Sequence, residues 1–155
     1  MKKISLAGCA FILDGKIILL ERTKTGWFEL PGGKIEEDET PEDAALREIR
    51  EELLVEARLV KKLGEKDFTE GEHTMAYHWF QAEALDGQTF AIGEKDKFTS
   101  LKAIPLEALT EHRLSPNMQN FVAALRNGEI QLVGKDAELR SETAQSEQHL
   151  GENRK

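Results

Sequence analysis

Three glutamates within residues 47–52 have the spacing of a metal site on one side of a helix. At 100° per residue, Glu48 and Glu52 lie one turn apart and Glu51 lies beside them. Like charges at these spacings destabilise a bare helix by about 0.2–0.5 kcal/mol per pair, so something should offset the repulsion. Clustered carboxylates are ligands for hard cations such as Mg²⁺ or Mn²⁺.

The same helix has a simpler interpretation, a solvated face on which Arg47 and Arg50 act as counter-charges. The segment before the helix favours the metal site. A Pro-Gly-Gly sequence at residues 31–33 leads into a charged loop at residues 34–39. Because paired glycines let the backbone and its carbonyls approach a ligand closely, we expect a bound cation here. The expected cofactor is Mg²⁺, with Mn²⁺ as a substitute.

The segment from residue 33 to residue 55 resembles the Nudix box, Gly-x5-Glu-x7-Arg-Glu-U-x-Glu-Glu-x-Gly-U, in which U is a bulky aliphatic residue. The matching positions are Gly33, Glu39, Arg47, Glu48, Ile49, Glu51, Glu52 and Val55. The late glycine of the family, which belongs to the turn that leaves the helix, is replaced by Leu54. The resemblance continues more weakly from Leu30 to about residue 130.

The resemblance implies roles for the matching residues. Glu48 and Glu52 would be the principal metal ligands, Glu51 a further ligand or a base, and the carbonyl of Gly32 would complete the cation's shell. Metal ions in such sites screen a polyphosphate, stabilise the leaving group and lower the pKa of a bound water. A nearby carboxylate then takes the proton of that water, and no phosphoenzyme is needed.

The resemblance adds Arg47 and Glu94 to the predicted catalytic residues Glu48, Glu51 and Glu52, and gives Glu39 a supporting role. Arg47 would orient a metal-binding carboxylate, and Glu39 would pair with Arg47 and brace the loop. Glu94 lies in a loop, residues 92–96, where several relatives carry a further catalytic or metal-binding glutamate.

Candidates for substrate recognition come from the MutT branch of the family. Arg22 matches an arginine that contacts phosphate, and Asn117 matches an asparagine that reads a purine edge, which an amide can do with a donor and an acceptor together. Either residue could instead be structural, a strand end or a helix cap. Phe68, Tyr77 and Trp79 could stack on a base or pack in the core, and Phe68 is our choice as a substrate contact.

The predicted function is therefore Mg²⁺-dependent cleavage of a phosphoanhydride in a nucleoside diphosphate derivative, with (d)NTP converted to NMP and pyrophosphate. The alternative is an ADP-ribose or nucleotide-sugar pyrophosphatase. The ADP-ribose members of the family tend to carry a proline about sixteen residues past the box, where this chain has residues 70–72 without one. A non-catalytic sensor that binds a nucleotide is a third hypothesis, disfavoured because the box carboxylates are all present.

Local signals position the acidic helix. Thr40 is the expected N-cap, Pro41 the first helical residue, and Asp43 completes a Thr-x-x-acid capping pattern. The helix is predicted to run to about Leu53. A second long helix should begin at Ser115 and Pro116 and end before Gly128, because serine caps a helix start and glycine follows a helix end.

Strands are predicted around these helices. Residues 4–13 and 16–20 form a hairpin across an Asp-Gly turn. Further strands are expected at residues 27–30, 59–60, 73–84 and 98–104, with one helical turn at 105–109. The fold class is α/β, a Nudix-type α/β/α sandwich with a mixed β-sheet between helices. One domain should span residues 1–134, followed by a polar, flexible tail at 135–155.

Composition limits the partners. The 155 residues carry a net charge of −8, which disfavours a nucleic acid polymer as partner. A small nucleotide remains a suitable substrate, because divalent cations supply positive charge locally. No apolar stretch reaches the length of a membrane span and we expect a cytoplasmic protein. The single cysteine, Cys9, cannot form an internal disulfide. The sequence leaves open whether the chain forms a homodimer.

Overall fold

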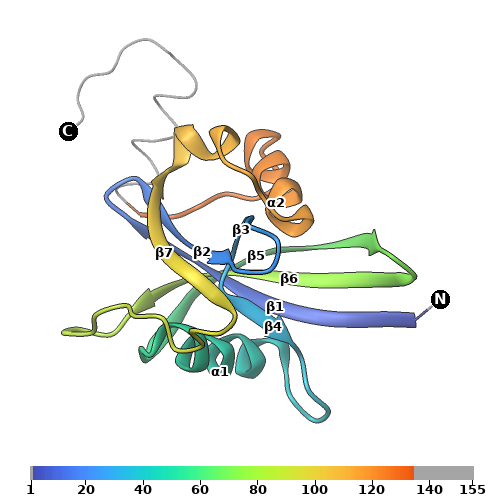
Figure 1. The fold of residues 1–155 in the computed structure, drawn as a ribbon, viewed down its shortest axis with the longest axis horizontal. Coiled ribbons are helices and arrows are strands. Elements are labelled where there is room, and N and C mark those ends of the chain that lie inside the picture. The colour runs from blue at the N-terminus through green and yellow to red at the C-terminus, as the bar shows by residue number, and fades with distance from the viewer. Residues whose placement is uncertain (1, 135–155) are drawn as a thin grey trace.

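Residues 2–134 of the computed structural model form a seven-stranded mixed sheet with a helix on each face (Figure 1). The strands are β1 Lys2–Leu13, β2 Lys16–Arg22, β3 Phe28–Glu29, β4 Gly32–Lys34, β5 Ala57–Glu70, β6 His73–Ala84 and β7 Phe98–Pro105. The helices are α1 Pro41–Leu53, the 3₁₀ helix η1 Leu106–Glu111, and α2 Pro116–Arg126. The predicted α/β sandwich is confirmed. The predicted flexible tail lies outside the described residues.

Strand β1 organises the sheet because it pairs with three other strands. It runs parallel to β6, with Leu6 opposite Tyr77, and antiparallel to β2 and β4. The hairpin from β1 to β2 turns at Asp14 and Gly15, whose φ angles of 55° and 76° are those of the two-residue turn predicted there. The pairing with β4 places Gly32 opposite Gly8, which brings the Pro-Gly-Gly segment onto the middle of the sheet.

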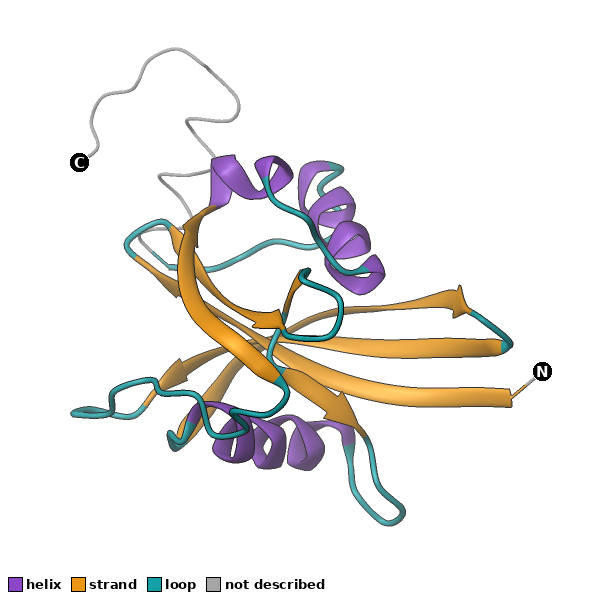
Figure 2. Cartoon of the chain, in the orientation of Figure 1, coloured by secondary structure: helices purple, strands orange, loops and turns teal. Residues whose placement is uncertain are grey.

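Two apolar cores lie on opposite faces of the sheet: one holds α1, and the other holds α2 and η1. Figure 2 shows these helices on the two sides of the sheet. Ile49 and Leu53 of α1 belong to the same core as Phe11 of β1. On the other face, Phe121 of α2 packs edge-on against Trp79 of β6, with ring centroids 5.4 Å apart. Because burial of each large side chain contributes about 1.5–3 kcal/mol, these cores fix both helices on the sheet.

Helix α1 begins and ends where the sequence predicts. The Thr40 side chain accepts a hydrogen bond of 3.0 Å from the backbone N–H of Asp43, and Pro41 is the first helical residue. At the other end, Leu54 takes the left-handed conformation, with φ 57° and ψ 38°. That conformation favours glycine, which explains why the family has glycine at this position.

Two strands differ from the prediction. Strand β5 extends to residue 70, although only Leu59 and Val60 looked strand-like, because its charged second half pairs along β6. Strand β4 forms over Gly32–Lys34, where a turn and the start of a loop were expected. In both segments, pairing with a neighbouring strand overrides weak intrinsic strand propensity.

Two compositional expectations have structural counterparts. Cys9 is buried in the core beneath α1, and this burial raises the pKa of its thiol to about 12, so the thiol stays protonated. None of the described helices has both the length and the apolar character needed to cross a membrane.

Candidate active site

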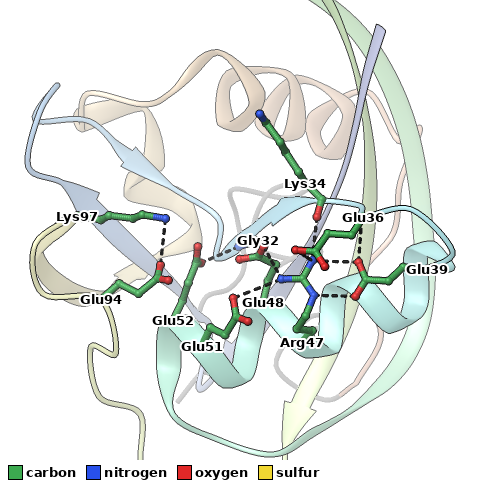
Figure 3. Close-up of polar contacts among 10 residues, drawn as sticks. All are labelled: Gly32, Lys34, Glu36, Glu39, Arg47, Glu48, Glu51, Glu52, Glu94 and Lys97. Carbon is green, nitrogen blue, oxygen red and sulfur yellow. Dashed lines mark hydrogen bonds and ion pairs between the residues drawn. The ribbon is translucent and has the colours of Figure 1, made fainter.

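The three glutamates of α1 differ sharply in burial. Glu51 is half-exposed and Glu48 is mostly buried, whereas Glu52 is only 3% exposed. Figure 3 shows the three side chains along α1. Burial raises the pKa of the Glu52 carboxyl well above its usual range, and the negative charges of Glu48, Glu29 and Glu94 raise it further. A hydrogen bond of 2.9 Å from the Gly32 N–H to Glu52 Oε1 acts in the opposite direction. Negative charge is thus concentrated around one buried carboxylate.

At both glycines before the acidic helix, neighbouring atoms leave no room for a side chain. A Cβ built on Gly33 would lie 2.5 Å from the Glu48 carboxylate. One built on Gly32 would overlap the Ala7 carbonyl and the Tyr77 hydroxyl. The backbone of β4 therefore lies directly against the glutamates, which is the close approach that the paired glycines predict.

Arg47 lies among four acceptors that it holds in a fixed arrangement. Its guanidinium donates to Glu39 at 2.6 Å and 3.0 Å, to Glu48 at 3.0 Å, to Glu51 at 3.3 Å and to the Lys34 carbonyl at 2.9 Å. The hydrogen bonds from Arg47 and from the Glu36 backbone lower the pKa of Glu39 to about 2. The structure thus brings Arg47 to Glu39 and to a carboxylate of the cluster, as the resemblance implies.

The loop after β6 brings Glu94 to the acidic helix. Two backbone hydrogen bonds dock this loop on the end of α1, from Gly93 N to Glu52 O at 2.8 Å and from Ala91 N to Leu53 O at 3.0 Å. Glu94 Oε1 is buried, accepts no hydrogen bond within residues 2–134, and lies 3.5 Å from Lys97 Nζ. Figure 3 shows the Glu94 side chain beside Glu52. The structure therefore groups Glu94 with the box glutamates.

The acidic cluster of Glu48, Glu51, Glu52 and Glu94 has the chemistry of a cation site, although its carboxylates do not converge on one point. Among the described residues, no three acidic, histidine or cysteine side chains converge closely enough to hold a metal ion. Glu48 and Glu51 turn toward Arg47, and Glu52 turns toward Gly32 N–H. A buried carboxylate surrounded by like charges is costly without a counter-ion. The candidate metal ligands are all oxygen atoms, and such a set fits Mg²⁺.

Arg22 is engaged by a neighbouring carboxylate. Its Nε and Nη2 donate to the two oxygens of Glu29 at 2.8 Å and 2.6 Å, and its guanidinium carbon lies 5.2 Å from the centre of the Phe98 ring. The Arg22 side chain is still 34% exposed. Phosphate binding by Arg22 stays a prediction, and a phosphate would have to compete with Glu29 for these donors.

Asn117 is almost fully buried, and its amide is already oriented. The oxygen Oδ1 accepts a hydrogen bond of 2.9 Å from Trp79 Nε1, which leaves the amide N–H groups as the available donors. Trp79 and Tyr77 are core residues, only 1% and 6% exposed, so packing is their role. Phe68 is half-buried in β5, opposite Met75, and packs against the same core.

Trp27 was not among the residues that the sequence predicted for the site. Trp27 donates a hydrogen bond of 2.9 Å from its ring nitrogen to Glu29 Oε1. Strand alternation could have identified it. Around β3, Trp27 and Glu29 share one face, while Phe28 and Leu30 enter the core.

Comparisons with known proteins agree with this geometry. Residues 3–125 match the NUDIX domain family. The "Uncharacterized Nudix hydrolase YvcI" of Bacillus subtilis (strain 168) is 31% identical, over 59% of this chain and 61% of that protein, which is less than two thirds of its length. The "Putative 8-oxo-dGTP diphosphatase" of the same organism is 29% identical, over 80% of this chain and 81% of that protein.

A solved structure shows the same arrangement of strands and helices. The crystal structure of a MutT NUDIX hydrolase from Burkholderia pseudomallei aligns with a TM-score of 0.73 and 25% identity, over 81% of this chain and 99% of that one. Together with the match over residues 3–125 and the acidic face of α1, this similarity shows that the chain belongs to the Nudix family.

Proposed function

We propose that this chain is a Mg²⁺-dependent pyrophosphohydrolase that cleaves a phosphoanhydride bond in nucleoside diphosphate derivatives. The proposed reaction converts a nucleoside or deoxynucleoside triphosphate to the monophosphate and pyrophosphate. One observation carries the proposal: Glu52 is a buried carboxylate whose neighbours Glu48, Glu29 and Glu94 are also acidic. A polyphosphate can approach so negative a site only with divalent cations between the two.

The chain's own residues suggest a division of labour. Glu48, Glu51, Glu52 and the Gly32 carbonyl would hold Mg²⁺, and Glu94 stands beside them. When bound, Mg²⁺ screens the polyphosphate and lowers the pKa of an attacking water. Glu51 or Glu94 would accept the proton of that water. Arg47 would keep Glu48 in place through the hydrogen bond of 3.0 Å.

Substrate recognition would use the neighbouring segments. Arg22 would meet a phosphate common to all nucleotide substrates, and the amide N–H groups of Asn117 would meet an acceptor on a purine. The similarity to the "Putative 8-oxo-dGTP diphosphatase" of Bacillus subtilis over 80% of this chain supports triphosphates as the substrate class.

The decisive experiment is a substrate panel with product identification. We would incubate the pure protein with Mg²⁺ and dNTPs, ADP-ribose, nucleotide sugars or dinucleoside polyphosphates, and separate the products by anion exchange. We expect deoxynucleoside monophosphate and pyrophosphate from the triphosphates, and no turnover after chelation of the metal. Cleavage of ADP-ribose without cleavage of triphosphates would reject the substrate assignment. Binding without cleavage of any compound would instead indicate a sensor.

A further inference from the structure

The indole of Trp27 is a large aromatic group that the core does not use. It is neither fully buried nor fully exposed, and it is absent from both hydrophobic cores of residues 2–134, which include the other tryptophan, Trp79. No other aromatic ring in the described part of the chain packs against it. Core packing therefore does not explain why a tryptophan stands at this position.

Trp27 is nevertheless held in place. Its ring N–H donates to Glu29 Oε1 at 2.9 Å, and Glu29 is itself fixed by two hydrogen bonds from Arg22. The backbone is also tied, since the Trp27 carbonyl accepts from Arg22 N at 2.8 Å and the Trp27 N–H donates to Thr25 Oγ1 at 3.4 Å. An aromatic ring that is oriented before binding loses little conformational entropy when a ligand packs on it.

The position of Trp27 relates it to the acidic cluster. Glu29, its hydrogen-bond partner, lies three residues before Gly32, whose N–H donates to Glu52 Oε1 at 2.9 Å. On the other side, Phe28 N donates to Arg113 O at 2.8 Å and Phe28 O accepts from Ser115 N at 3.0 Å. Trp27 therefore belongs to a segment that is tied at Gly32 to the predicted metal site and at Phe28 to the chain that leads into α2.

We infer that the Trp27 indole is a stacking platform for the heterocyclic base of a nucleotide whose phosphates lie at the acidic cluster. The inference rests on the proposed function. Every base has a π-face, so stacking supplies affinity without choosing among bases. Trp27 would therefore stack on the base. Trp79 and Tyr77 are buried in the core, and Phe68 packs against it.

Intrinsic fluorescence tests the inference directly, because the chain contains only two tryptophans and Trp79 is 1% exposed. We would titrate the protein with α,β-methylene dGTP and Mg²⁺, and separately with methylenediphosphonate and Mg²⁺, which has no base. We expect the nucleotide analogue to quench the emission and the base-free analogue to leave it unchanged. Trp27→Phe retains Trp79, whose ring nitrogen donates to Asn117, and the nucleotide analogue should quench its emission much less than that of wild type.

Steady-state kinetics provides the second measurement. Trp27→Ala should raise KM for all dNTPs by about ten- to hundred-fold, whereas Trp27→Phe keeps a ring and should stay within a few-fold of wild type. If Trp27→Phe is as impaired as Trp27→Ala, the residue serves only to hold Glu29 and the inference is wrong.

Failure of the inference and failure of the proposed function give different results. If dNTPs are cleaved and the analogue inhibits without quenching, stacking on Trp27 is excluded while the proposed function stands. Quenching of equal size in Trp27→Phe would also exclude it. If no nucleotide is cleaved and the analogue does not raise the melting temperature, the proposed function is wrong and the inference is wrong with it.

Discussion

Arg47 donates two hydrogen bonds to Glu39, at 2.6 Å and 3.0 Å, and thereby ties the loop before α1 to the helix that carries the acidic cluster. The same guanidinium contacts Glu48 and the Lys34 carbonyl. A planar group with five donors can meet these acceptors together, and an ammonium group cannot. Arg47 is thus a positioning residue whose geometry matters as much as its charge.

Arg47→Lys should therefore lower kcat although the charge is kept. A displacement of about 1 Å at a metal-binding carboxylate lowers rates by about 100-fold, and we expect a loss of that order. The matched control is Arg50→Lys on the same helix, because the Arg50 side chain is half-exposed and, within residues 2–134, pairs only with Glu56, at 3.8 Å. The control should behave as wild type. Equal effects of the two substitutions would show that Arg47 contributes only charge.

Glu52→Gln tests the metal site. Turnover should fall by at least about 100-fold at saturating Mg²⁺, since loss of a ligand exceeds the effect of losing a residue that supports one. Without metal, the variant should melt at a higher temperature than wild type, because a buried, repelled negative charge has been removed. Wild type should gain thermal stability from Mg²⁺ and the variant should gain much less.

The exposed Glu56→Gln is the control for this test. It removes a carboxylate just beyond the same helix and should change neither turnover nor the response to Mg²⁺. Near-normal activity of Glu52→Gln would remove Glu52 from the predicted ligand set.

The sequence predicts α1 and its acidic face well because the signals are local. Thr40 and Asp43 form the cap, and the glutamates recur at helical spacing. The remaining parts of the site depend on tertiary contacts. Glu94 reaches the cluster only because the Gly93 N–H bonds to the Glu52 carbonyl, and β4 forms only because Gly32 pairs with Gly8. No local pattern encodes either contact.

Leu54→Gly should stabilise the protein. Leu54 has φ 57° at the end of α1 and its side chain is 58% exposed, so it has left-handed strain and little burial to offset it. That strain costs about 1–2 kcal/mol, and the extra flexibility of an unfolded glycine removes about 0.5–1 kcal/mol of the gain. We expect the free energy of unfolding to rise by about 0.5–1 kcal/mol, measured by denaturant unfolding.

Leu54→Ala is the control, because it keeps the strain and should not raise the free energy of unfolding. A similar gain in both variants would attribute the effect to the exposed side chain.

Gly93→Ala tests whether docking of the loop positions Glu94. A Cβ at residue 93 would overlap the Glu51 carbonyl, so the loop must move away from the end of α1. The activity of this variant should fall in the same direction as that of Glu94→Gln, and its melting temperature should also drop because two backbone hydrogen bonds to α1 are lost. Lys95→Ala, an exposed change in the same loop, is the control. Full activity in Gly93→Ala and Glu94→Gln would exclude Glu94 from the catalytic group.

Asn117 offers a test of base recognition that separates binding from folding. Asn117→Ala removes the acceptor of the buried Trp79 N–H, which should cost about 1–3 kcal/mol of stability whatever the role of the residue. Asn117→Asp keeps an acceptor for Trp79 and removes the amide donors.

If these donors read a purine, Asn117→Asp should reduce kcat/KM for dGTP and dATP by about ten- to hundred-fold relative to pyrimidine triphosphates, as expected for a lost base contact of about 1–3 kcal/mol. The measurement is the ratio of kcat/KM between purine and pyrimidine substrates, compared at a temperature where both variants are folded by circular dichroism. A uniform loss across all four bases would show that Asn117 serves only to satisfy Trp79 and to start α2.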